Sequence, residues 1–253
     1  HYNLIMTFEG SMNKSIRTPW SDDFPDTVID RKLGEATGHT MYEAAKSGDA
    51  VAALELVEDL ISDEAVYALI QVIAGRDVAL IPVLAEEAIG RNKIPLAAAL
   101  KLSSILKCNC KLNVLQLTKV SRTGGDGWHR IASQPQFGIL SGEGIKSTGC
   151  YLLIDDTQTQ GGTFAALRGY VEKNGGTVIG CYALTGKQYS VQLRLSEEIL
   201  LELRSKYAEL EPWFVQTFGY DFASLTQWEA KFILNSRKST HEVRAAIFTA
   251  RNE

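Results

Sequence analysis

Two adjacent carboxylates end an apolar run in the stretch YLLIDDTQTQGGTF, which spans residues 151–164. Asp155 and Asp156 are followed by a short polar segment that contains glycines and threonines. Paired carboxylates suit sugar hydroxyls or a magnesium ion. Glycines let a backbone close around a phosphate, and threonine hydroxyls add hydrogen-bond donors. The stretch therefore predicts a phosphate cradle beside a diol or metal site, with a well-made turn after a buried strand as the alternative.

The apolar run before the carboxylates predicts the strand that positions them. In an open parallel sheet, ligands bind outside the carboxyl ends of the strands, where loops lead into helix N-termini with unpaired N–H groups. The segment has neither the P-loop pattern nor the glycine pattern of dinucleotide-binding folds. A phosphate cradle and a carboxylate pair at one loop form the layout that a phosphorylated ribose requires.

The rest of the chain supplies further strands and helices for such a sheet. Apolar runs at 78–84, 113–120 and 177–184 indicate strands, and helical patterns lie between them. This alternation predicts an α/β fold with a parallel sheet and right-handed crossovers. Residues 121–149 are glycine-rich and too long for an ordinary connection, which is typical of a functional or mobile loop.

The flanking regions differ from this central part. Residues 13–40 are rich in turn-forming residues and predict an irregular arm, whereas 41–75 and the chain from Ser196 onward show helical spacing. We therefore expect four parts: a start that is either not native or disordered (1–12), an N-terminal arm with helices (13–75), a core (76–190) and a C-terminal helical cap (191–253).

Composition narrows the function classes. The net charge of −4 argues against a nucleic-acid partner, because sequence-independent binding needs a basic surface. We expect no membrane partner and a cytoplasmic location, because no apolar run reaches the roughly 18–20 residues that span a bilayer and the opening residues lack a signal-peptide pattern. The cysteines match no usual zinc spacing and predict free thiols rather than a metal site. They are Cys108, Cys110, Cys150 and Cys181.

The apolar run, the two acids and the T-x-G-G-T pattern resemble the phosphoribosyl-pyrophosphate (PRPP) motif of type I phosphoribosyltransferases. The resemblance covers roughly residues 76–190, and the segment RTGGDGWHR is similar to a bacterial group of such proteins with no assigned substrate. It implies a Rossmann-like type I phosphoribosyltransferase core with a mainly parallel sheet, flanked by N- and C-terminal helices.

The same resemblance assigns roles to the residues of the motif. Asp155 and Asp156 would be the catalytic acids that bind the ribose hydroxyls and Mg²⁺. Gln160 stands where many members have a second threonine, so its bulk is expected to alter the cradle. The residues implied for the 5′-phosphate cradle are Thr157, Thr159, Gln160, Gly161, Gly162 and Thr163.

Three further segments receive roles by the same resemblance. The loop after 78–84 would bind pyrophosphate, although its basic residues could simply solvate a helix start. A flexible loop before the motif strand would close over PRPP, with Arg122 and Arg130 neutralising the leaving group and His129 transferring a proton. Lys187 would contact the acceptor, unless it is a surface lysine in a turn. The pyrophosphate candidates are Ala85, Glu86, Arg91 and Lys93.

The leading functional prediction is a Mg²⁺-dependent phosphoribosyltransferase. A nitrogen nucleophile such as a nucleobase would displace pyrophosphate from PRPP. The alternative is a non-catalytic protein that binds PRPP or a nucleotide and signals through its helical flanks. The sequence also allows the reverse reaction, in which a ribosyl bond of a nucleotide is broken by pyrophosphate or water. A homodimer is possible.

Overall fold

The computed structural model describes residues 16–87, 90–118, 126–139 and 141–252. Among these residues, five strands form one sheet in which every neighbouring pair is parallel. The expected α/β class with a mainly parallel, Rossmann-like sheet is thereby confirmed. In spatial order the strands are β1 (Val28–Lys32), β9 (Thr177–Gly186), β8 (Cys150–Gln158), β2 (Val78–Pro82) and β5 (Asn109–Cys110).

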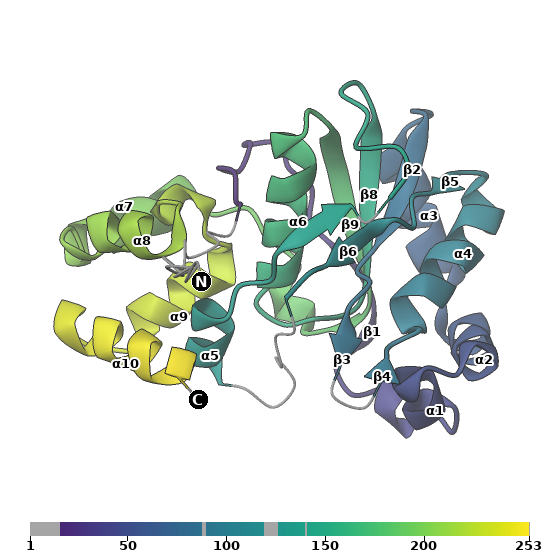
Figure 1. The fold of residues 1–253 in the computed structure, drawn as a ribbon, viewed down its shortest axis with the longest axis horizontal. Coiled ribbons are helices and arrows are strands. Elements are labelled where there is room, and N and C mark those ends of the chain that lie inside the picture. Colours follow the sequence, from purple (N-terminus) through teal and green to yellow (C-terminus); the bar gives the residue numbers. More distant parts are fainter. Residues whose placement is uncertain (1–15, 88–89, 119–125, 140, 253) are drawn as a thin grey trace, which may run out of the picture.

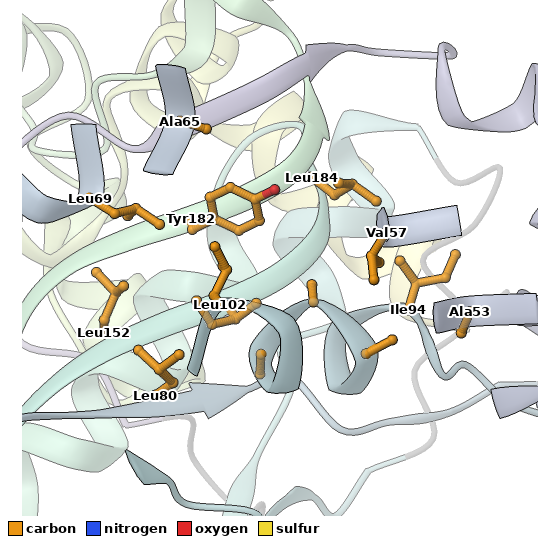
Figure 2. Packing of buried hydrophobic residues seen from close by; sticks show 14 of the residues in the cluster. Ala53, Val57, Ala65, Leu69, Leu80, Ile94, Leu102, Leu152, Tyr182 and Leu184 are labelled. Atoms are coloured by element: carbon orange, nitrogen blue, oxygen red, sulfur yellow. The ribbon is translucent and has the colours of Figure 1, made fainter. Parts of the chain in front are cut away.

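Helices cover one face of this sheet and pack on it through apolar stripes (Figure 1). Asp49 and Ser62 cap the second and third of these helices by accepting backbone N–H bonds. Figure 2 shows side chains such as Leu69 and Leu102 meeting Tyr182 of β9 in the buried cluster. The helices are α1 (Tyr42–Ser47), α2 (Ala50–Leu60), α3 (Asp63–Ile73) and α4 (Ile94–Leu106).

The other face is covered by α6 (Gly162–Lys173), whose apolar residues pack against β8 and β9. A two-stranded antiparallel sheet, β6 (Val114–Gln116) with β7 (Phe137–Ile139), joins the same buried cluster. The prediction that 113–120 forms a strand of the parallel sheet is therefore wrong, because β5 takes that edge position. An apolar run indicates a strand, but it does not reveal which partner the strand will find.

A second buried cluster lies among the C-terminal helices, and it is rich in aromatic side chains such as Phe214 and Phe222. The helical pattern from Ser196 is split into two helices, with Tyr207 just after the first. In Figure 1 these helices lie together at the left, beyond α6. The C-terminal helices are α7 (Glu197–Lys206), α8 (Leu210–Phe218), α9 (Gln227–Asn235) and α10 (Thr240–Asn252), and α5 (Gly127–Ala132) from the middle of the chain packs with them.

The N-terminal arm is more regular than its sequence suggests. The expectation of an irregular 13–40 is wrong for Val28–Lys32, which pairs with β9 at the sheet edge. The preceding residues cross α6, where the Arg168 guanidinium lies 4.3 Å from the centroid of the Trp20 ring. The described residues also include three short 3₁₀ turns: Ala36–Gly38, Gln188–Ser190 and Phe222–Ser224.

None of the helices in the described part of the chain is both long and apolar enough to cross a bilayer. All four cysteines are free, as expected, although Cys181 is buried and the other three are partly exposed.

The crossing of the arm over α6 yields a stability prediction. A β-carbon at Gly169 would lie 2.3 Å from the carbonyl oxygen of Ile16 and 2.6 Å from the α-carbon of Arg17. Because both are backbone atoms, the arm has to shift, and Gly169→Ala should lower the free energy of unfolding by about 1–3 kcal/mol. Urea unfolding measures this. The control Gly144→Ala, at an exposed position with open space around it, should stay within about 0.5 kcal/mol. Equal stabilities of the two variants would contradict the close crossing.

Candidate functional site

The acid pair lies on the central strand β8, near its carboxyl end. Asp155 and Asp156 are buried, at 7% and 8% exposure. The strand continues beyond them to Gln158, so Thr157 and Gln158 belong to β8 and not to the loop that the sequence suggests. The Thr157 hydroxyl lies 3.0 Å from that of Thr185 on β9. The carboxylates are therefore held by a rigid, paired strand.

Asp156 is contacted by two side chains from outside the motif. Lys46 on α1 donates from its Nζ to Asp156 Oδ2 at 2.8 Å, and Asn92 Nδ2 donates to the same oxygen at 2.8 Å. Asn92 is itself buried, and its Oδ1 accepts the backbone N–H of Ile94 at the start of α4. Asp155 Oδ1 accepts the backbone N–H of Asp156. The pair is thus embedded in a polar network that spans α1, β8 and the start of α4.

This network gives the two carboxyls opposite proton affinities. Burial and the neighbouring Asp156 carboxylate raise the pKa of Asp155 well above the usual aspartate value. Burial also opposes ionisation of Asp156, but Lys46 and the hydrogen bond from Asn92 outweigh it and lower the pKa of Asp156. Asp155 is therefore the proton-holding member of the pair and Asp156 the ionised one.

The raised pKa of Asp155 predicts a pH-dependent gain of stability in Asp155→Asn. Above the ordinary carboxyl pKa of about 3.9, the unfolded chain releases a proton that the native Asp155 retains, so this group opposes folding increasingly as the pH rises. The ionised Asp156 affects stability in the opposite direction. Its stabilising contribution is present at neutral pH and is lost as the pH falls through its lowered pKa.

Asp155→Asn removes the unfavourable group and keeps a side-chain oxygen for the backbone N–H of Asp156. It should therefore be more stable than the natural chain at pH 8, and the difference should shrink toward pH 4. Urea unfolding at several pH values measures this difference. A difference that does not vary with pH would contradict the assignment of the proton to Asp155.

The loop after β8 is short, consisting of Thr159, Gln160 and Gly161. Gly161 has a left-handed φ of 78°, and a β-carbon there would lie 2.1 Å from Leu193 Cδ2. A glycine is therefore required both for the turn and for the packing. Gly162 and Thr163 follow as the first residues of α6, whose N-terminal N–H groups can donate to an anion. The side-chain oxygen of Gln160 is buried without a hydrogen-bond partner among the described residues.

The C-terminal helices support this loop from behind. The Thr226 hydroxyl, at the start of α9, donates to the Gln160 carbonyl oxygen at 2.6 Å. Arg17 donates to the Gly162 carbonyl oxygen at 3.3 Å and forms a buried ion pair with Glu229 at 2.6 Å. Glu229 also closes a capping box with Thr226. The predicted phosphate cradle is thereby attached to the second buried cluster.

The segment predicted to bind pyrophosphate forms a hairpin against α1. After Ala85, β3 (Glu86–Glu87) pairs antiparallel with β4 (Gly90–Arg91), and Glu86 lies opposite Arg91. Arg91 is exposed, and the backbone N–H of Lys93 donates to the Ala45 carbonyl oxygen of α1 at 3.1 Å. Asn92 connects this hairpin directly to Asp156. The roles of these residues stay predictions.

The remaining described candidates lie on other elements than the acid pair. His129 and Arg130 are on α5, which packs against α9 and α10, and His129 Nδ1 lies 3.1 Å from the Ala250 carbonyl oxygen. Arg122 lies outside the described residues. Lys187 follows β9, and its backbone N–H donates to the Gln158 carbonyl oxygen. The Lys187 ammonium is 5.7 Å from the centroid of the exposed Tyr189 ring. The catalytic and acceptor roles of these residues are untested predictions.

The acid pair as arranged does not fit a directly bound magnesium ion. Mg²⁺ takes oxygen ligands at 2.0–2.1 Å in near-octahedral geometry, whereas Asp156 Oδ2 already accepts from Lys46 and Asn92. Within the described ranges, no group of three or more His, Cys, Asp or Glu side chains is placed to hold a metal ion.

Two residues that sequence reasoning did not assign to the site contact it directly. Lys46 lies more than a hundred residues before the motif in a helical stretch, and nothing in its local pattern indicates the contact. Asn92 carries a partial signal, because an asparagine just before a helical pattern commonly accepts a backbone N–H there. Its contact with Asp156 has no such signal.

The known proteins with similar sequences have names that state no activity. No family model matches the chain. Protein TraN of Escherichia coli is 40% identical over 244 residues, which are 96% of this chain and 53% of that protein. An uncharacterized protein of Haemophilus influenzae is 52% identical over 161 residues, which are 63% of this chain and 35% of that protein. The chain thus spans about half or less of these relatives.

Among solved structures, a purine phosphoribosyltransferase of Pyrococcus horikoshii matches with a TM-score of 0.31 and 17% identity, over 50% of this chain and 82% of that one. The adenine phosphoribosyltransferase of Leishmania donovani matches with a TM-score of 0.33 and 15% identity, over 68% of this chain and 76% of that one. Both TM-scores are low, so these matches do not assign an activity to this chain.

Proposed function

We propose that this chain binds PRPP at the carboxyl edge of its sheet and transfers the phosphoribosyl group to a nitrogen nucleophile, with release of pyrophosphate. The observation that carries the proposal is the buried pair of Asp155 and Asp156 on β8, with Asp156 five residues before Gly161 in the turn into α6. One rigid strand and one helix start thus offer acceptors for a diol and donors for a phosphate.

Each part of the site has a task in this proposal. Asp155 and Asp156 accept hydrogen bonds from the ribose hydroxyls and orient the sugar. The N-terminal N–H groups of α6 and the Thr163 hydroxyl donate to the 5′-phosphate. The hairpin that ends at Arg91 faces the pyrophosphate. Catalysis then consists of positioning and charge stabilisation, without a covalent enzyme intermediate.

Calorimetric titration with PRPP, with and without Mg²⁺, tests the binding step. Mass spectrometry of PRPP incubated with the protein and a metabolite extract tests the transfer. We expect saturable binding, a new ribosyl-5′-phosphate adduct and free pyrophosphate. Absence of PRPP binding under both conditions would contradict the proposal.

A non-catalytic PRPP or nucleotide sensor is the second candidate, and one observation favours it. The cradle loop is bonded to the C-terminal helices through Thr226 and Arg17, so occupancy of the loop can change the stability of α9. A sensor should show PRPP-dependent protection of α9 in hydrogen exchange and no turnover with any extract. Turnover would exclude this candidate.

A further inference from the structure

The charge at the acid pair is already balanced by a side chain of the protein. The Lys46 ammonium lies 2.8 Å from Asp156 Oδ2, and only 13% and 11% of the two side chains are exposed. A buried pair at this distance is screened weakly by salt. Asn92 donates to the same oxygen. Lys46 and Asn92 therefore use both lone-pair positions of Asp156 Oδ2.

The backbone around Lys46 holds the ammonium in this place. Lys46 is in the last turn of α1, and the carbonyl oxygen of the neighbouring Ala45 accepts the N–H of Lys93. A β-carbon at Gly48, just after the helix, would lie 3.5 Å from the Arg91 carbonyl oxygen. The end of α1 therefore packs on the 90–93 segment, which also carries Asn92. Lys46 and Asn92 reach Asp156 from two contacting elements.

We propose that the Lys46 ammonium is the resident cation of the acid pair, in the place where the sequence suggests Mg²⁺. Lys46 is then a positioning residue that keeps Asp156 ionised and oriented, and the pair binds no divalent ion. The orientation toward ribose hydroxyls rests on the proposed function, whereas the exclusion of a divalent ion does not.

Binding of Mn²⁺ to the full chain, followed by electron paramagnetic resonance, tests this proposal without any substrate. The natural chain and Asp156→Asn should give the same Mn²⁺ isotherm, because the pair takes no ion in either. Lys46→Met should gain a site at least about tenfold tighter than any in the natural chain, since a close unit charge no longer opposes the ion. That site should disappear in Lys46→Met/Asp156→Asn.

Lys101→Met is the matched control, because Lys101 pairs with Glu58 away from the site and the net charge changes equally. It should gain no Mn²⁺ site. Circular dichroism checks folding, and Lys46→Gln replaces Lys46→Met if the latter does not fold.

Two results would overturn the proposal: a Mn²⁺ site in the natural chain that Asp156→Asn removes, or a folded Lys46 variant with no gain. Failure of PRPP binding is a separate result. It would contradict the proposed function and leave the Mn²⁺ comparison intact.

Discussion

Replacement of both acids, Asp155→Asn/Asp156→Asn, is expected to weaken PRPP binding at least about tenfold. A hydrogen bond to the ionised Asp156 contributes about 1.5–3 kcal/mol and one to the protonated Asp155 about 0.5–1.5 kcal/mol, and about 1.4 kcal/mol is tenfold in affinity. Calorimetric titration of PRPP measures the change.

The control for this variant has to lose the same charge elsewhere. Asp63→Asn removes one exposed negative charge from the first turn of α3, which equals the loss of the ionised Asp156. Its PRPP affinity should equal that of the natural chain. Unchanged affinity in the Asp155/Asp156 variant, with folding verified by circular dichroism, would contradict the assignment of the site.

Arg17→Met is expected to produce the largest loss of stability. Arg17 and Glu229 form an ion pair with side-chain exposures of 0% and 1%. Removing one partner leaves the other charge buried, which costs about 3–5 kcal/mol and lowers the melting temperature by on the order of 10 °C. Arg17 also donates to Gln134 Oε1 and to the Gly162 carbonyl oxygen, so those groups lose a partner as well. Calorimetric melting measures the loss.

An exposed arginine of similar geometry provides the comparison. Arg204 binds both carboxylate oxygens of Glu211, but its side chain is 41% exposed. Arg204→Met should cost about 0–1 kcal/mol, because solvent screens the pair. The double variant Arg17→Met/Glu229→Gln should recover part of the loss, since no bare charge stays buried. Equal losses for Arg17→Met and Arg204→Met would contradict the argument from burial.

The two effects are connected through the loop between β8 and α6. Thr226 donates to the Gln160 carbonyl oxygen of this loop, and Arg17 donates to the Gly162 carbonyl oxygen at the start of α6. The N-terminal arm and α9 thus support the same few residues that would hold a phosphate. Arg17→Met is therefore expected to weaken PRPP binding in addition to stability, whereas Arg204→Met is not. Titration of both variants below their melting temperatures separates these contributions.

Local patterns in the sequence determined much of the framework. Apolar runs of strand length and helical spacing between them are properties of short segments, so they predict β2, β8, β9 and α6 correctly. The same holds for the acid pair at the end of a buried strand and for Gly161, whose left-handed backbone only a glycine adopts at low cost. These features depend on the residues next to them in the chain.

Other features depend on which distant segments meet, and the tertiary structure alone decided them. The edge strand β1 comes from an arm with no strand pattern, and β6 pairs with β7 outside the main sheet. Lys46 reaches Asp156 from a helix far away in the sequence, and Arg17 pairs with Glu229 across 212 residues. Burial of such charges is favourable only when a partner arrives in three dimensions. The acid pair and the glycine turn are therefore evident in the sequence, whereas the Lys46 charge beside Asp156 is evident only in the fold.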